Sequence, residues 1–259
     1  GDWVHRGAGR YIPPPPHNSL ISPNSVLAFH LLRTSPPPVP LRYNAPGEAL
    51  MRAGHMAIIV ASAPPFFIAV STVSALIAPD HNSLSDTMSM LTGPSIPHPW
   101  VFQFGVVGYA LLIQFLGPLL YTQAGRGRHG ALLWTLVFIY GVAGILAAAF
   151  RDGYDALVLW HISENTVHDF VARLSFSAVL LLIFFTPWAL RHQEGWHIWR
   201  WFSLAVGILT IVLIIPFEVE MWPSYLGLIQ RVLFATTLLW ILVTAFILRS
   251  ELPNSLVRD

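Results

Sequence analysis

The chain has 259 residues, of which 54% are hydrophobic and only 10% are charged, and its formal net charge is +1. Soluble domains carry about 25% charged residues, so this chain has too few to cover a surface that faces water. The composition excludes a soluble enzyme, a nucleic-acid-binding protein and a disordered chain, and it favours a protein with several membrane spans. The absence of cysteine excludes disulfides, thiolate nucleophiles and metal sites that use cysteine.

The first 50 residues differ in composition from the rest of the chain. Pro13–Pro16 is a run of four prolines, and a second proline-rich stretch covers residues 36–40. Such stretches favour an extended polyproline II conformation, and Ser25–Arg33 between them has the pattern of a short amphipathic helix at a membrane surface. We expect residues 1–50 to form an extended, proline-rich cytoplasmic arm, which is either a simple tail or a contact surface for a partner protein.

Six apolar stretches follow, and each approaches the length of about 20 residues that a helix needs to cross a bilayer. They cover residues 56–79, 101–121, 130–150, 170–190, 201–217 and 226–248. Hydrophobic residues run continuously through these stretches instead of alternating, which favours helices over the strands of a barrel. The sequence therefore predicts an all-α protein with a six-helix transmembrane bundle in residues 51–250 and a short cytoplasmic tail in residues 251–259.

Prolines occur within several of the predicted spans. Pro64 and Pro65 lie in the first, Pro118 in the second and Pro187 near the end of the fourth. A membrane helix tolerates proline where neighbouring groups satisfy the freed carbonyl, so kinks are the simplest expectation. The alternative is a broken helix that lines a transport site, for which Pro64–Pro65 is the best candidate. Pro216 is expected to end the fifth span.

Charged residues alternate in sign from one connection to the next. Acidic residues dominate the connections after the first, third and fifth spans, whereas arginines dominate those after the second and fourth. Arginine and lysine concentrate on the cytoplasmic side of membrane proteins. The pattern predicts a multi-pass protein of the inner (cytoplasmic) membrane with both termini in the cytoplasm and the lipid bilayer around its helices.

Charged and polar residues gather on the predicted outer side. Arg173 and Arg231 each lie one turn into a span, where a charge is costly unless it has a partner. They either form structural ion pairs with nearby acids or line a polar pocket that opens outward. The predicted outer cluster consists of Asp86, Ser89, His168, Asp169, Arg173, Glu218 and Arg231.

His161, Glu164 and His168 form the most specific short pattern in the chain. If residues 161–168 were helical, the three side chains would share one face. Two imidazoles and a carboxylate are suitable ligands for Zn²⁺, with a fourth position open to water. The alternative is that Asn165 or Thr166 caps the start of the fourth helix. Every histidine that accompanies the spans lies at a span end or in a loop, which argues against a haem held between two helices.

Three motifs resemble a six-span membrane family known as domain of unknown function 998. Residues 81–100 (HNSLSDTMSMLTGPSIPHPW) are similar to its first outer loop, residues 167–170 (VHDF) to the His-Asp pair that opens its fourth span, and residues 227–232 (GLIQRV) to the start of its last span. The resemblance covers about residues 57–249 and implies six helices in a membrane, but no activity and no catalytic residue. By position it draws attention to Asp86, Ser89, His168, Asp169 and Arg231.

Three functions are compatible with these features. The first is a non-catalytic accessory or assembly subunit of a larger complex, which contacts other membrane subunits through residues 1–50 and its helix faces. The second is an outward-facing metal-dependent hydrolase or lipid-modifying enzyme that uses the zinc set described above. The third is a small-solute transporter with a helix break at Pro64–Pro65 and with Arg173, Glu218 and Arg231 as binding charges. The sequence contains no recognised catalytic motif or nucleotide fingerprint, which favours the first.

Overall fold

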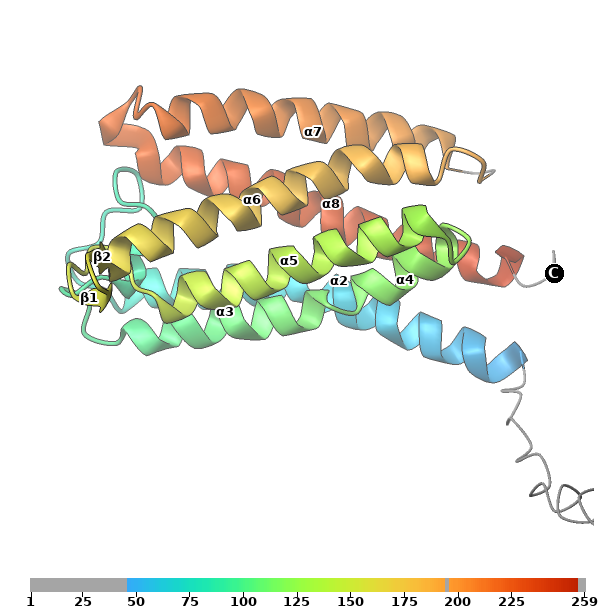
Figure 1. The fold of residues 1–259 in the computed structure, drawn as a ribbon, viewed down its shortest axis with the longest axis horizontal. Coiled ribbons are helices and arrows are strands. Elements are labelled where there is room, and N and C mark those ends of the chain that lie inside the picture. Colours follow the sequence, from blue (N-terminus) through green and yellow to red (C-terminus); the bar gives the residue numbers. More distant parts are fainter. Residues whose placement is uncertain (1–45, 194–195, 256–259) are drawn as a thin grey trace, which may run out of the picture. The chain divides into compact units, whose positions relative to one another are not determined.

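The computed structural model describes residues 46–193 and 196–255, and nearly all of their regular structure is helical (Figure 1). The predicted arm up to residue 45, with its amphipathic segment Ser25–Arg33, lies outside the described residues. In chain order the elements are α2 (Pro46–Leu76), η1 (Ser89–Thr92), α3 (Pro99–Ile113), α4 (Leu116–Gln123), α5 (Arg128–Ala149), β1 (Leu157–Leu159), β2 (Ile162–Ser163), α6 (Glu164–Ala189), α7 (His197–Glu218), η2 (Pro223–Tyr225) and α8 (Leu226–Ser255).

Six helical segments of the described chain are long and apolar enough to cross a membrane. They are Leu50–Leu76, Pro99–Gln123, Arg128–Ala149, Glu164–Ala189, His197–Glu218 and Pro223–Ser250. The predicted all-α fold with six apolar helices is therefore confirmed. The helix α2 begins at Pro46, well before the predicted span, so residues 46–50 of the predicted arm are helical.

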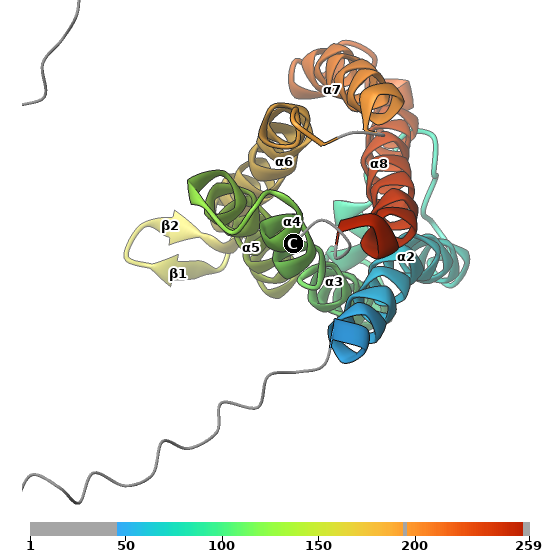
Figure 2. The ribbon, with the colours of Figure 1, turned by 90° about the vertical axis from the view of Figure 1, so that its right-hand side faces the viewer.

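The six spans form a closed ring (Figure 2). Around the ring, α2 packs against α3, α3 against α5, α5 against α6, α6 against α7, α7 against α8, and α8 returns to α2. We call the end that carries β1, β2 and the loops of residues 77–98 and 219–225 the hairpin end (Figure 1). The start of α2 and the end of α8 both lie at the opposite end, as an even number of spans requires.

The second span is broken into α3 and α4, and Pro118 explains the break. Proline has no N–H to donate to the carbonyl four residues earlier, and its ring collides with that carbonyl, which here belongs to Gln114. The chain tightens at this point: the Gln114 N–H donates to Leu111 O (3.3 Å) and the Gly117 N–H donates to Gln114 O (3.2 Å), three residues back instead of four. Beyond the break, α4 contacts α2, α5 and α8 and so fills this part of the ring.

The first span has no such break, because α2 runs through Pro64 and Pro65 without interruption. The alternative of a broken first span is therefore wrong. The expectation that Pro216 ends the fifth span is also wrong, since α7 continues to Glu218. The helix ends where Glu220 takes a positive φ of 47° and the Met221 N–H bonds back to Pro216 O at 3.0 Å, which satisfies a carbonyl of the last turn.

Candidate functional site

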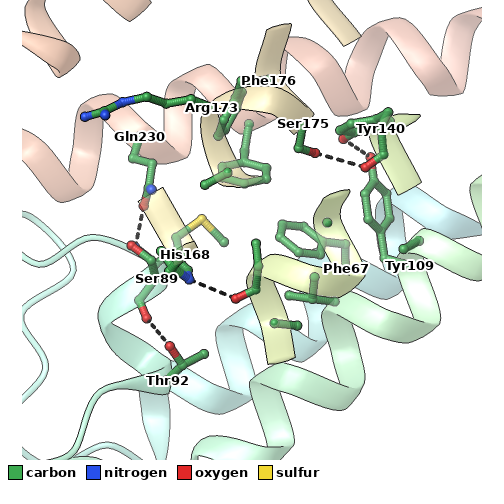
Figure 3. Close-up of a pocket in the computed structure, with 18 of the residues that line it drawn as sticks. Phe67, Ser89, Thr92, Tyr109, Tyr140, His168, Arg173, Ser175, Phe176 and Gln230 are labelled. Atoms are coloured by element: carbon green, nitrogen blue, oxygen red, sulfur yellow. Dashed lines mark hydrogen bonds between the residues drawn. The ribbon is translucent and has the colours of Figure 1, made fainter. Parts of the chain in front are cut away.

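A cavity of about 180 Å³ lies inside the ring, toward the hairpin end (Figure 3). Its walls come from α2, α3, α5, α6, α7, α8 and the loop around η1. The deepest wall residues include Ile113, at the end of α3, and Gly141 of α5, which lie beside the break in the second span. The cavity thus reaches as far as the break between α3 and α4.

Gln114 joins the two helices at this point. Its side-chain Nε2 donates to Ala110 O of α3 (3.3 Å) and to Val137 O of α5 (3.4 Å). A Cβ atom at Gly141 would collide with this amide, so only glycine lets α5 approach the break closely. The polar groups freed at the break are in this way satisfied within the bundle, as a membrane environment requires.

Aromatic rings line the deep part of the cavity. The ring of Phe67 lies 4.9 Å from that of Tyr109 and 5.2 Å from that of Phe234, and Phe176 packs edge-on against Phe234 at 5.0 Å, all measured between centroids. These rings belong to α2, α3, α6 and α8. Such a surface accepts an apolar or aromatic group through dispersion and ring-edge contacts.

The polar atoms in this deep part are already paired. The hydroxyls of Tyr109 and Tyr140 lie 2.8 Å apart, and the Ser175 hydroxyl donates to Tyr140 O at 3.0 Å (Figure 3). A hydrogen bond between two hydroxyls uses one of their two protons. The tyrosine pair therefore keeps a single donor in an otherwise apolar space.

Polar side chains surround the cavity at the hairpin end. Arg173 of α6 donates from Nε to Glu218 Oε2 of α7 at 3.1 Å; the Arg173 side chain is largely exposed and that of Glu218 is partly exposed. Gln230 of α8 accepts a hydrogen bond from the Met88 backbone N–H at its side-chain oxygen. The lining at this end comprises Ser89, His168, Asp169, Arg173, Glu218 and Gln230, which include five members of the predicted outer cluster.

His168 is buried and holds the end of α5. Its Nδ1 lies 2.8 Å from Ala147 O and 2.7 Å from Phe150 O. Because both neighbours are acceptors, Nδ1 carries a proton and donates it to the last carbonyls of that helix. Among the described residues, the second ring nitrogen, Nε2, makes no hydrogen bond, and His168 is one of the residues that line the cavity.

Asp86 and Arg231, the other two members of the predicted cluster, do not line the cavity. The guanidinium of Arg231 donates from Nη1 to Ser83 O (2.8 Å), Asp86 O (2.9 Å) and Gly227 O (2.9 Å), and from Nη2 to His81 Nε2 (2.9 Å). The side chain of Arg231 thereby holds the loop of residues 77–98 against the start of α8. The structure therefore divides the predicted outer cluster into two parts. Arg231 and Asp86 belong to what we call the loop anchor, and the other five residues lie at the polar end of the cavity, which we call its mouth.

The loop anchor depends on a close approach of the two backbones. The Gly227 N–H donates to Ser85 O at 3.2 Å, and a Cβ atom at position 227 would collide with the backbone oxygen of Asp86. The Asp86 carboxylate accepts from the Asn82 N–H and the Ser85 hydroxyl, each at 2.8 Å. Burial opposes ionisation of Asp86, but these bonds outweigh it and lower its pKa. The anchored loop continues into η1, which forms one wall of the cavity.

His81 makes the anchor sensitive to pH. Its side chain is 1% exposed, its Nε2 accepts from Arg231, and its Nδ1 lies 3.8 Å from Asp86 Oδ2. Burial and then the charge of Arg231 lower the pKa of His81, against the opposing charge of Asp86. The folded chain thus binds a proton at His81 less readily than the unfolded chain does.

We expect neutral His81 to make its full contribution to the free energy of unfolding above pH 6.5, the ordinary pKa of histidine. The contribution should decline as the pH falls from 6.5 toward the lowered pKa of His81 in the folded protein. Thermal unfolding of the purified protein between pH 8 and pH 5 measures it. His81→Gln is the matched control, because an amide oxygen accepts from Arg231 but does not titrate. An identical pH dependence in both proteins would show that another group is responsible.

The predicted zinc set is not brought together. The helix α6 begins at Glu164, so His161 lies in the turn between β1 and β2 and does not share a helical face with the other two residues. The Glu164 carboxylate accepts from Arg151 Nε (2.8 Å) and from the Arg151 backbone N–H (2.7 Å). The hydrogen bond between the two side chains raises the pKa of Arg151. Within residues 46–193 and 196–255, no three His, Asp or Glu side chains are placed to hold a metal ion.

The cap of α6 also differs from the prediction. Ser163 accepts from the Thr166 N–H at its side-chain oxygen (3.2 Å) and caps the helix, instead of Asn165 or Thr166. The short strand β2 ends at Ser163, so the helix cap lies two or three residues earlier than expected. Asn165 instead accepts from the Gly153 N–H at 2.8 Å and ties the helix start to the preceding loop.

The aromatic lining is the part of the site that the sequence did not reveal. Phe67, Phe102, Phe176 and Phe234 look like ordinary membrane-helix residues. A usable signal was present in Tyr109, Tyr140, Gln114 and Gln230, because polar groups inside apolar spans need partners and so face the interior of the bundle.

A comparison with protein-family models identifies the family of the chain. The model described as "Protein of unknown function (DUF998)" matches residues 61–247, which is most of the chain and includes most of the six helices. No curated protein and no solved structure matches the chain. The motifs around Asp86, His168 and Arg231 fall within the matched residues, in agreement with the resemblance that they suggested. The chain therefore belongs to the DUF998 family, and its six long apolar helices make it an integral membrane protein.

Proposed function

We propose that this membrane protein binds a small amphiphilic molecule inside its helix ring. The observation that carries the proposal is the division of the cavity into an aromatic depth and a polar mouth. Ligand sites typically combine apolar walls with a few polar groups that set orientation. The apolar part of the ligand would occupy the space between Phe67, Tyr109 and Phe176, and its polar part would meet His168 Nε2 and the charged residues of the mouth.

The cavity volume limits the ligand. An apolar protein cavity of about 150 Å³ is large enough to hold benzene. The present cavity, at about 180 Å³, has room for a single ring or a short alkyl segment. The buried part of the ligand is therefore small, in contrast to the long acyl chains of a complete phospholipid.

The polar mouth is suited to exchange of partners. Arg173 is 65% exposed, and exposed ion pairs contribute only about 0–1 kcal/mol to stability. A polar ligand group can replace Glu218 as the partner of Arg173, or Arg173 as the partner of Glu218, at little cost. Both residues were also the proposed binding charges of a transporter, but the proposal here requires binding and no passage.

Filling the cavity tests this function. Gly144 lies on its wall in α5, and a Cβ atom there would meet only the Ser175 hydroxyl, at 3.8 Å. We expect Gly144→Leu to reduce binding of a short-chain alkylphenol by at least tenfold, measured by cross-linking of a diazirine derivative in nanodiscs. Thermal stability should be retained, because leucine fills space and favours the helix by about 1 kcal/mol over glycine.

Ala149→Leu is the matched control, since Ala149 is exposed at the end of the same helix and does not line the cavity. Equal labelling of the wild type, the control and Gly144→Leu would contradict the proposal. Mass spectrometry of small molecules that remain bound through purification from native membranes would then identify the natural ligand.

A role as an accessory or assembly subunit is the second candidate. It is supported by the proline-rich composition of residues 1–50, which suits an extended contact with another protein. Removal of residues 1–45 leaves α2 complete, because this helix begins at Pro46. We expect the truncated protein to lose its association with other membrane subunits in mild detergent. Association that is unchanged by the truncation would argue against this role.

A further inference from the structure

The hairpin formed by β1 and β2 has an apolar, exposed tip. Trp160 is 90% exposed, and Leu157, Val158 and Ile162 are exposed as well. The residues of this hairpin, 157–163, have the sequence LVLWHIS, without Asp, Glu, Lys or Arg. An exposed apolar patch of this kind marks an interaction surface, and its burial would remove no permanent charge from water.

The backbone of Trp160 supports this interpretation independently. Leu159 pairs with Ile162, so Trp160 and His161 form a two-residue turn. Trp160 has a φ of 52°, in the left-handed region that favours glycine or asparagine in such turns. Formation of the turn alone does not favour tryptophan here. A large side chain at a strained backbone position points to a role in binding.

The position of the hairpin indicates what it contacts. Figure 2 shows it projecting sideways from α5 and α6, and Figure 1 places it at the level where the helices end. The adjacent outer face of α6 exposes Phe170 and Leu174, so the hairpin patch is near the apolar surface that faces lipid. In a bundle that crosses a bilayer, this level coincides with the membrane–water interface, where tryptophan is enriched.

We propose that the hairpin of residues 157–163 lies in the interfacial region of the bilayer, with Trp160 inserted among the lipid headgroups. Its partner is therefore a lipid surface. The hairpin extends the footprint of the bundle sideways along the membrane and helps to set the depth and tilt of α5 and α6. This inference does not depend on the ligand proposed for the cavity.

Site-specific labelling tests the proposal, because the chain contains no cysteine and a single introduced one is unique. Val158→Cys places an environment-sensitive nitrobenzoxadiazole label beside Trp160, and Asp155→Cys places it on an exposed polar position of the same connection. In vesicles of phosphatidylcholine and phosphatidylglycerol, the label at 158 should emit at shorter wavelength than that at 155. Lipids that carry a nitroxide near the headgroup should quench it at least twofold more strongly.

Trp160→Gly separates binding from folding. Glycine suits a φ of 52°, so this variant should keep the thermal stability of the hairpin and of the bundle. It should return the emission of the label at 158 to that of the control. Equal emission at 158 and 155 in vesicles, or no effect of Trp160→Gly, would overturn the proposal. Shielding that depends on protein density would instead indicate a second copy, and shielding found only in native membranes would indicate a partner protein.

Discussion

Replacement of Arg231 by methionine will lower the free energy of unfolding by about 2–4 kcal/mol, because it removes one charged donor that serves three backbone carbonyls and His81. Two of those carbonyls belong to Ser83 and Asp86 of the loop. Without the guanidinium both carbonyls lose this partner, Asp86 O in a part-buried position and Ser83 O in an exposed one, and the loop of residues 77–98 detaches from the start of α8. Thermal unfolding measures the loss, and faster hydrogen exchange at the Gly227 amide, which bonds to Ser85 O, reports the detachment.

Arg173→Met is the matched control for this substitution. Arg231 lies in the second turn of α8 and Arg173 in the third turn of α6, both toward the hairpin end. Arg173, however, is 65% exposed, and its contact is the ion pair with Glu218. Its loss should cost less than about 1 kcal/mol. Equal losses in the two variants would show that the carbonyl contacts of Arg231 contribute little to stability.

Replacement of Trp240 by alanine will lower the free energy of unfolding by about 3–5 kcal/mol, since it leaves a large cavity in a closely packed core. This residue lies in the part of the ring that is farther from the hairpin end. Trp240 is fully buried on α8. Its Nε1 donates to the Ser203 hydroxyl of α7 (2.8 Å), and that hydroxyl donates in turn to Ile183 O of α6 (2.8 Å). The indole therefore joins three helices, and thermal unfolding in a fixed detergent measures its effect.

Two variants divide this effect into its parts. Trp240→Phe keeps most of the ring volume and loses the bond to Ser203, so it should cost about 1–2 kcal/mol. Trp201→Ala removes an exposed indole from α7 and should change stability by less than about 1 kcal/mol. A Trp240→Ala protein as stable as Trp201→Ala would mean that the core relaxes to fill the space.

The candidate site was only partly predictable. The cost of a charge within a membrane span was enough to single out Arg173 and Arg231, because each needs polar partners wherever it lies. Their different partners, Glu218 for one and backbone carbonyls for the other, depend on which loop lies over which helix end. His168 was marked by its motif, but its contact with the carbonyls of α5 arises from the packing of α5 against α6.

The sequence by itself determined the class of the protein. Six apolar stretches of about membrane length must be helical, because only a helix satisfies every backbone polar group of a single span in lipid. The same reasoning did not locate the helix break, since Pro64, Pro65 and Pro118 all lie within spans. Tertiary contacts decide the outcome: at Pro118 the carbonyl groups find partners in a tightened turn and α4 finds a place inside the ring, whereas α2 remains continuous.

Only the tertiary structure decided that the ring contains a cavity. The rings of Phe67, Tyr109, Phe176 and Phe234 come from four helices and are far apart in the chain, and they meet because α2, α3, α5, α6, α7 and α8 close into a circle. Local sequence patterns indicate which residues avoid water and which need a hydrogen-bond or ion-pair partner. They do not record which helix faces meet, because lipid is as apolar as the core and leaves that choice to packing and to a few hydrogen bonds.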